Sequence, residues 1–288
     1  MATVRQWISG ARPRTLPAAV TPVAVGTGAA FPNPRFATAG LALLVALALQ
    51  IGVNYANDYS DGIKGTDDDR VGPFRLVGSK SASPNSVLLV AIIMFLIAAI
   101  SGLTLAAMIT WWLVPVGIAA ITAAWGYTGG SKPYGYRALG ELSVFVFFGL
   151  VAVMGTYYVQ LQSLNWWVFL ASIPIGFLAC ALLTINNLRD IPSDDLVGKR
   201  TLAVVLGERR TRTLYYALIS GAYFSALALS TWRAGAAMAL LTTALLVDPL
   251  RKVRLGATGK ELIPVLVATA RIQLLFGLLL AMGLAVTA

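Results

Sequence analysis

The stretch that decides the fold runs from Ala37 to Val53 and reads ATAGLALLVALALQIGV, without one charged residue. It leads directly into NYANDYSDGIKGTDDD, from Asn54 to Asp69, which holds five of the chain's twelve acidic residues. A helix of about 20 apolar residues is long enough to cross the hydrocarbon core of a bilayer. The sequence therefore predicts a membrane-spanning helix that ends in a block of carboxylates.

Similar apolar runs recur along the 288 residues, of which 58% are hydrophobic and only 12% are charged. A soluble domain has about 25% charged residues. The runs are much longer than the ~10-residue strands of a membrane barrel, and only helices and barrels satisfy the backbone in lipid. We therefore predict an all-α polytopic membrane protein, with a single membrane-embedded domain over residues 1–288. Nine transmembrane helices are expected, near 15–31, 37–60, 84–106, 110–128, 139–159, 165–187, 212–231, 233–249 and 268–287.

The first of these spans is short and also fits a signal peptide behind Arg5, Arg12 and Arg14. Its polar flank ARPRTLP favours a span that is retained. With nine spans, all of the 22 basic residues except Arg35 and Arg233 fall on the side of the N-terminus. Because cytoplasmic loops collect basic residues, we expect the N-terminus in the cytoplasm and the C-terminus outside the cell membrane. The same rule explains the net charge of +10, so no nucleic-acid partner is expected.

The chain has one cysteine, Cys180, and no histidine. This composition excludes an intrachain disulfide, haem or zinc ligated by histidine, and catalytic pairs of serine or cysteine with histidine. Any bound metal ion must therefore be held mainly by oxygen atoms.

Two acidic clusters end two of the predicted helices, about 130 residues apart. The first cluster comprises Asn54, Asn57, Asp58, Asp61 and Asp67, and a continuing helix places Asn54, Asp58 and Asp61 on one face with Asn57 beside them. The second comprises Asn186, Asn187, Asp190 and Asp194, of which Asn186, Asp190 and Asp194 share one face.

Such a face repels itself unless a cation is bound, and we expect no buried basic partner for it. Mg²⁺ prefers carboxylate oxygens and usually completes its shell with water and substrate phosphates. The alternative is a pair of solvated helix ends with Asn and Asp in capping or turn positions. Two matching clusters on the same side favour the cation, whereas Asp68 and Asp69 are interpreted as a solvated loop.

A diphosphate bound through Mg²⁺ leaves excess negative charge, so nearby basic residues should complete the site. For each candidate the alternative is ordinary positive charge on the cytoplasmic side. The candidates are Arg70, Arg75, Lys132, Lys199 and Arg200.

Three motifs, in the order NDYSDGIKGTD, YTGGSKPYGYRALGE and NNLRDIPSDDLVGKRTLAV, resemble those of the membrane-embedded aromatic prenyltransferases. The resemblance covers nearly the whole chain and is closest to the branch that prenylates 1,4-dihydroxy-2-naphthoate in menaquinone biosynthesis. It implies a helical bundle around a central cavity, capped on the cytoplasmic side by the two acidic helix ends. It also implies a polyprenyl diphosphate donor, Mg²⁺ as cofactor, and a reaction that releases CO₂ inside a lipid bilayer.

The resemblance further implies roles for individual residues. The expected Mg²⁺ ligands are Asp58, Asp61, Asp67, Asp190 and Asp194. The expected diphosphate-binding residues are Asn54, Asn57, Arg70, Lys132, Asn187 and Lys199. The expected catalytic residues are Asp58, Asp61, Asp190, Asp194 and Lys132.

The acceptor site is less defined. Glu141 is the only acid near its end of the fifth span, so it is a candidate base or cation anchor, with a structural ion pair as the alternative. Arg137 is a candidate partner for the acceptor's carboxylate, and Tyr127 is one of several aromatic residues expected to line the cavity. Another acceptor, such as 4-hydroxybenzoate or homogentisate, remains open. An ion-coupled transporter is an alternative of a different class, but its carboxylates belong near the midplane of the membrane.

Overall fold

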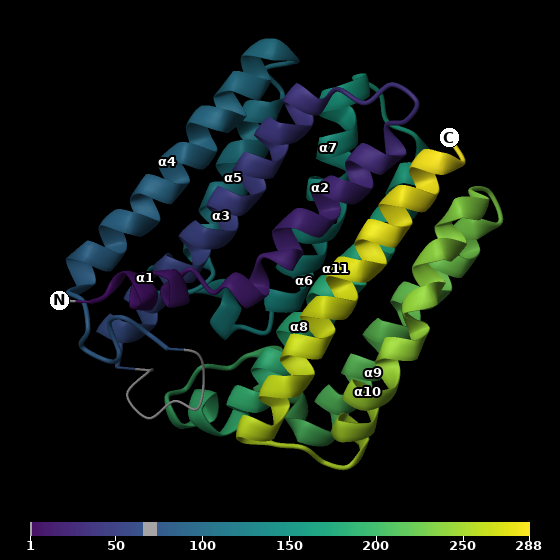
Figure 1. Ribbon diagram of the computed structural model, residues 1–288. Helices are drawn as coiled ribbons and strands as arrows, with labels where there is room; N and C mark the ends of the chain where they lie inside the picture. The colour runs from purple at the N-terminus through teal and green to yellow at the C-terminus, as the bar shows by residue number, and fades with distance from the viewer. Residues whose placement is uncertain (1, 66–73) are drawn as a thin grey trace.

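The computed structural model describes residues 2–65 and 74–288, and these residues form helices joined by short links (Figure 1). One isolated bridge pairs Arg137 with Arg200. The all-α prediction is therefore confirmed. The helices are α1 Val4–Gly10, α2 Pro17–Ala29, α3 Phe36–Ile63, α4 Pro84–Met108, α5 Leu113–Gly126, α6 Gly140–Val144, η3 Phe145–Val151, α7 Ala152–Leu161, α8 Trp166–Leu196, α9 Leu202–Ser230, η4 Ala234–Leu246, α10 Val247–Arg254 and α11 Leu262–Val286, with short turns η1 Pro13–Thr15, η2 Tyr134–Tyr136 and η5 Gly259–Glu261.

Seven of the helical stretches in the described residues are long and apolar enough to cross a membrane. The chain is therefore a multi-pass membrane protein, as predicted. α2 and α5 have 13 and 14 residues, which is shorter than the ~17–25 residues of an ordinary span. The count of nine spans thus stays a prediction for these two helices.

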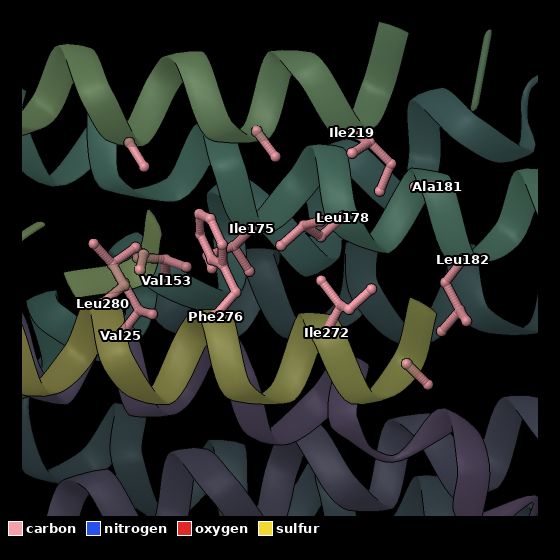
Figure 2. Packing of buried hydrophobic residues seen from close by; sticks show 14 of the residues in the cluster. Val25, Val153, Ile175, Leu178, Ala181, Leu182, Ile219, Ile272, Phe276 and Leu280 are labelled. Atoms are coloured by element: carbon pink, nitrogen blue, oxygen red, sulfur yellow. The ribbon is translucent and has the colours of Figure 1, made fainter. Parts of the chain in front are cut away.

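α8 is the central helix of the bundle. Of its most apolar window 72% is buried inside the protein, whereas no other spanning stretch exceeds 50%. Figure 2 shows Ile272 and Phe276 of α11 pointing toward Ile175 and Leu178 of α8, in the main cluster of buried apolar residues. The helix that carries the second acidic cluster is thus held on several sides by packing.

The stretch Gly140–Leu161 is one continuous span, but its middle turns, η3, form a π-helix. There a Cβ on Gly149 would lie 2.6 Å from the Cα of Gly176 in α8, so only glycine allows this approach of the two backbones. The segment α9 begins earlier than the predicted boundary at 212, but its backbone is non-helical at Gly207, with φ 72° and ψ 168°, so a kink separates a short first helix from the long helix that follows.

The two helices that carry acidic clusters are longer than the membrane requires. With 28 residues in α3 and 31 in α8, they extend about 42 and 46 Å, against a hydrocarbon core of ~30 Å. Their final turns, which hold Asp61 and Asp194, lie close together because both carboxylates contact Lys199. We call this end of the bundle the polar end, and the end where α8 begins the apolar end.

Candidate active site

A cavity of about 620 Å³ opens between α3, α4, α5, η3, α7 and α8. Most of its wall is apolar, and its polar side chains come mainly from the last turns of α3 and α8 and from the segment after α5. These include Asn54, Asn57, Asp61, Arg75, Thr128, Asn186, Asn187 and Lys199. The cavity therefore joins an apolar interior to a polar mouth formed by both acidic clusters.

Asp61 lies at the centre of the polar mouth and is almost completely buried. Its Oδ1 accepts a hydrogen bond of 2.7 Å from the Tyr136 hydroxyl. Its Oδ2 lies 3.3 Å from Nη2 of Arg75 and 3.9 Å from Nζ of Lys199. This carboxylate thus connects α3 with the segments that precede α4, α6 and α9.

Lys199 joins the two acidic clusters. Its ammonium lies 3.4 Å from Oδ1 of Asp194, and its backbone N–H donates to the Asp194 carbonyl at 2.8 Å. The same ammonium lies 5.3 Å from the centre of the Tyr136 ring, with Lys64 at 5.1 Å. Burial lowers the pKa of the Lys64 ammonium, and the charge of Asp61 opposes that shift. Positive charge is therefore concentrated beside the buried carboxylate.

Asp58 and the two asparagines of the first cluster hold the surrounding segments in place. Asp58 accepts hydrogen bonds from the backbone N–H groups of Leu76 and Val77, at 2.7 and 3.1 Å, and so fixes the segment that carries Arg75. The Asn54 amide donates to the Ala11 carbonyl at 3.0 Å. The Oδ1 of Asn57 accepts a hydrogen bond of 2.6 Å from the Thr128 hydroxyl.

The second cluster corrects one expectation, that the acidic faces have no buried basic partner. Arg189 is buried and donates from Nε and Nη2 to both oxygens of Asp190, at 2.7 and 2.8 Å. Arg75 and Lys199 are also largely buried beside Asp61. Sequence neighbours on a helix do not normally face each other. The long arginine side chain nevertheless folds back onto the adjacent carboxylate.

The residues predicted for the acceptor separate into two groups. Tyr127 lines the cavity, and Glu141 lies behind it, buried, with Oε1 accepting a 3.1 Å hydrogen bond from the Asn187 amide. Lys132 and Arg137 are exposed and do not line the cavity. The structure therefore brings Lys199, rather than Lys132, between the two clusters.

Four of the sequence candidates, Asp67, Asp68, Asp69 and Arg70, lie outside the described residues. The structure adds hydrogen bonds to three carboxylates that were not predicted from the sequence. Asp61 accepts from Tyr136, Asp190 accepts from Arg189, and Asp58 accepts from the backbone N–H groups of Leu76 and Val77. Only Tyr136 carried a signal, because it lies within the YTGGSKPYGYRALGE motif.

The donor set fits Mg²⁺. Within residues 2–65 and 74–288, no group of three acidic or thiol side chains is placed to hold a metal ion by itself. The polar mouth instead offers carboxylate and carboxamide oxygens from two helices. Two of these carboxylates, those of Asp61 and Asp194, already contact one positive charge, the ammonium of Lys199. One or two carboxylates completed by substrate phosphates and water is the usual way in which proteins hold Mg²⁺.

The comparisons with known proteins agree with this site. A Mycobacterium tuberculosis protein named 1,4-dihydroxy-2-naphthoate octaprenyltransferase is 51% identical over 287 residues, covering 99% of this chain and 98% of the relative. An Escherichia coli protein of the same name is 38% identical, over 96% of this chain and 94% of the relative.

Among solved structures, a UbiA homolog from Archaeoglobus fulgidus bound to GPP and Mg²⁺ has a TM-score of 0.69 at 14% identity. The match covers 96% of this chain and 99% of that one, so the fold is shared. The UbiA prenyltransferase family pattern matches residues 17–262. With helices, cavity and sequence in agreement, the chain belongs to the UbiA prenyltransferase family.

Proposed function

We propose that this chain, as a single prenyltransferase domain over residues 1–288, transfers a polyprenyl group from polyprenyl diphosphate to 1,4-dihydroxy-2-naphthoate, with release of CO₂. The observation that carries the proposal is Lys199, whose ammonium contacts Asp61 and Asp194 at the mouth of an apolar cavity. A mouth of this kind suits a diphosphate with a metal ion, and the cavity behind it suits an isoprenoid chain. The relatives named for this reaction support the acceptor.

The polar mouth binds the diphosphate and stabilises it as it leaves. Mg²⁺, when bound there, neutralises negative charge on the diphosphate; its proposed ligands are Asp58, Asp61, Asp67, Asp190 and Asp194. Lys199 supplies a further positive charge, as do Arg70 and Lys132 in the proposed site. Preorganised charges of this kind are often the largest single contribution to an enzyme's rate. Asn54 and Asn57 complete the proposed diphosphate-binding set, whereas Asn187, predicted from the sequence for the same set, is assigned here to the acceptor because of its bond to Glu141.

The proposed reaction breaks one C–O bond, forms one C–C bond and releases CO₂. The allylic C–O bond breaks and its electron pair leaves with the diphosphate. The electron-rich ring carbon that bears the carboxylate forms the new C–C bond, and loss of that carboxylate as CO₂ restores the aromatic ring. No oxidant is needed, and no proton must be removed from the substituted carbon.

The allylic carbocation must be kept from water, and the cavity wall does this. Phe147 and Phe148 line the cavity from the π-helix, and Tyr127 lines it near the polar mouth. Aromatic faces attract cations and exclude water. Phe145, in the same π-helix, packs against Phe177 instead.

Glu141 acts on the acceptor through Asn187 in this proposal. Its Oε1 accepts a hydrogen bond from the Nδ2 of Asn187, which lines the cavity, and we propose that the Oδ1 of this asparagine faces the acceptor. An amide oxygen accepts hydrogen bonds only, which suits a hydroxyl of the acceptor ring. Tyr127 and Arg137 remain proposed acceptor-binding residues on the same side of the site.

We expect Glu141→Leu to raise the KM for the naphthoate about tenfold, because leucine has no hydrogen-bond acceptor and Asn187 then loses the bond that fixes its orientation. The KM for the prenyl diphosphate should stay unchanged. Cys180→Ala is the control, since the Cys180 thiol contacts Glu141 at its backbone carbonyl rather than at its carboxylate. A rise in the donor KM instead would place Asn187 on the diphosphate.

The proposed function is tested with purified protein, labelled octaprenyl diphosphate and a panel of acceptors. We expect labelled CO₂ from carboxyl-labelled dihydroxynaphthoate in step with prenylated quinol, and loss of both when a chelator removes Mg²⁺. Prenylation of 4-hydroxybenzoate with its carboxylate retained, and no turnover of the naphthoate, would contradict the proposed acceptor.

We further propose that the polar end faces the cytoplasm and that the protein resides in the plasma membrane, because 20 of the 22 basic residues lie on that side in a nine-span topology. Single cysteines at Ser81 and Thr287, in a Cys180→Ala background, should react with impermeant reagents from opposite sides. Labelling of both from one side would contradict the nine-span topology.

A further inference from the structure

Three glycines line the central cavity far from the acidic clusters: Gly102 in α4, Gly117 in α5 and Gly155 in α7. Gly102 lies six residues before the end of α4 and Gly117 four residues after the start of α5, so both lie near the short link between these helices. Gly155 lies six residues before the end of α7, which leads into the start of α8. Since the other end of α8 carries Asp194, all three glycines belong to the apolar end.

Neither packing nor backbone conformation explains these three glycines. A Cβ at any of them would meet no heavy atom within 4 Å, and all three lie in regular helix. The contrast is Gly149, where a Cβ would lie 2.6 Å from the facing helix. Because glycine in a helix costs about 1 kcal/mol relative to alanine, the open space at these positions calls for another reason.

The space beside the three glycines is the cavity itself. Its lining follows one face of α3 from Asp61 to Ala42, a rise of about 28 Å. The cavity therefore runs from the polar mouth across most of the ~30 Å hydrocarbon core. A ligand anchored at the mouth and long enough to fill the cavity reaches the glycines with its far end.

We infer that Gly102, Gly117 and Gly155 keep the apolar end open for the distal isoprene units of the donor, and so set the longest chain that the enzyme accepts. The inference rests on the proposed function, which anchors the diphosphate beside Asp61. With that end fixed, a short chain stops before the glycines, whereas a long chain must pass between them. A side chain at any of the three positions shortens the space available.

The test compares Gly117→Leu and Gly155→Leu with the unmodified full-length protein, each reconstituted in vesicles. The measured quantity is the ratio of kcat/KM for octaprenyl diphosphate to kcat/KM for geranyl diphosphate, with one acceptor. We expect this ratio to fall about 10- to 200-fold, the discrimination that one misfitting group gives in an apolar pocket. Leucine is a better helix former than glycine, so the helices should persist.

Gly40→Leu is the matched control. Gly40 also lies in a helix with open space at its Cβ position, but it lines a separate groove between α2, α3 and α11. The control should keep the ratio of the unmodified protein. An unchanged ratio in both test variants, or an equal fall in the control, overturns the inference.

The same assay separates this inference from the proposed function. If the unmodified protein transfers neither prenyl group, the proposed function fails and the inference falls with it. If the unmodified protein is active and the test variants lose activity equally with both donors, the glycines serve general packing or lipid contact. That result overturns the length-setting role alone.

Discussion

Replacing Asp61 with asparagine should lower kcat by about 10²- to 10³-fold, the loss typical of one preorganised charge in an active site. Asp61 is the carboxylate that Tyr136, Arg75 and Lys199 all contact at the polar mouth. Asparagine keeps the shape and one oxygen but removes the negative charge that binds a cation. Steady-state kinetics with saturating donor and Mg²⁺ measure the effect.

The controls for this prediction are Asp68→Asn and Asp69→Asn, which were interpreted from the sequence as a solvated loop and should each lower kcat only slightly. Asp190→Asn is a poorer probe, because it leaves the Arg189 guanidinium buried beside a neutral partner. Breaking such a pair costs about 3–5 kcal/mol of stability. A loss of equal size at Asp61, Asp68 and Asp69 would remove the distinction between the cluster and the loop.

Lys199→Met should have the second largest effect, lowering kcat/KM for the prenyl diphosphate by about 10²-fold. The substitution removes an ammonium that, within the described residues, contacts both Asp61 and Asp194, and so takes a positive charge away from two buried carboxylates. The loss of a contact to the leaving group acts in the transition state as well as on binding. Competition by inorganic diphosphate should weaken in parallel.

Lys132→Met is the matched comparison, since both lysines follow a glycine-containing turn and both were predicted to bind diphosphate. Its ammonium is exposed and makes no ion pair within the described residues, so we expect a smaller loss than at Lys199. If Lys132→Met is the more severe change, the principal cation of the site is Lys132 and the bridge at Lys199 is structural.

The sequence predicted the apolar spans and the two acidic helix ends, because hydropathy and helical spacing are local properties. Asp61 lies in the last turn of α3, at the end of the apolar run that begins at Ala37, and Asp194 lies in the last turn of α8. Lys199 could be named as a basic partner because it follows the second cluster closely in the chain. Its position between both clusters depends on how the turn at Gly198 folds back, with a φ of 71°.

The contacts that escaped prediction depend on tertiary packing. The local sequence does not indicate that Asp58 accepts hydrogen bonds from the backbone N–H groups of Leu76 and Val77, because these residues lie 18 and 19 positions further along the chain. The pairing of Arg189 with Asp190 escaped for a related reason, because a buried side chain folds where its neighbours leave room. The π-helical turns at Phe145–Val151 were likewise not predicted, and there Gly149 lies against the backbone of Gly176 in α8.

The shortness of α5 has a consequence for the surrounding lipid. Its 14 residues extend about 21 Å, roughly 9 Å less than the hydrocarbon core, and none of them is buried within the protein. In the proposed nine-span topology α5 crosses the bilayer, and the resulting hydrophobic mismatch would be relieved by local thinning of the bilayer at a cost of fractions of a kcal/mol per Å. Because α5 forms one wall of the cavity, a bilayer that must thin around α5 also acts on that wall. The acyl-chain length of the host membrane, which sets the bilayer thickness, would then affect the enzyme.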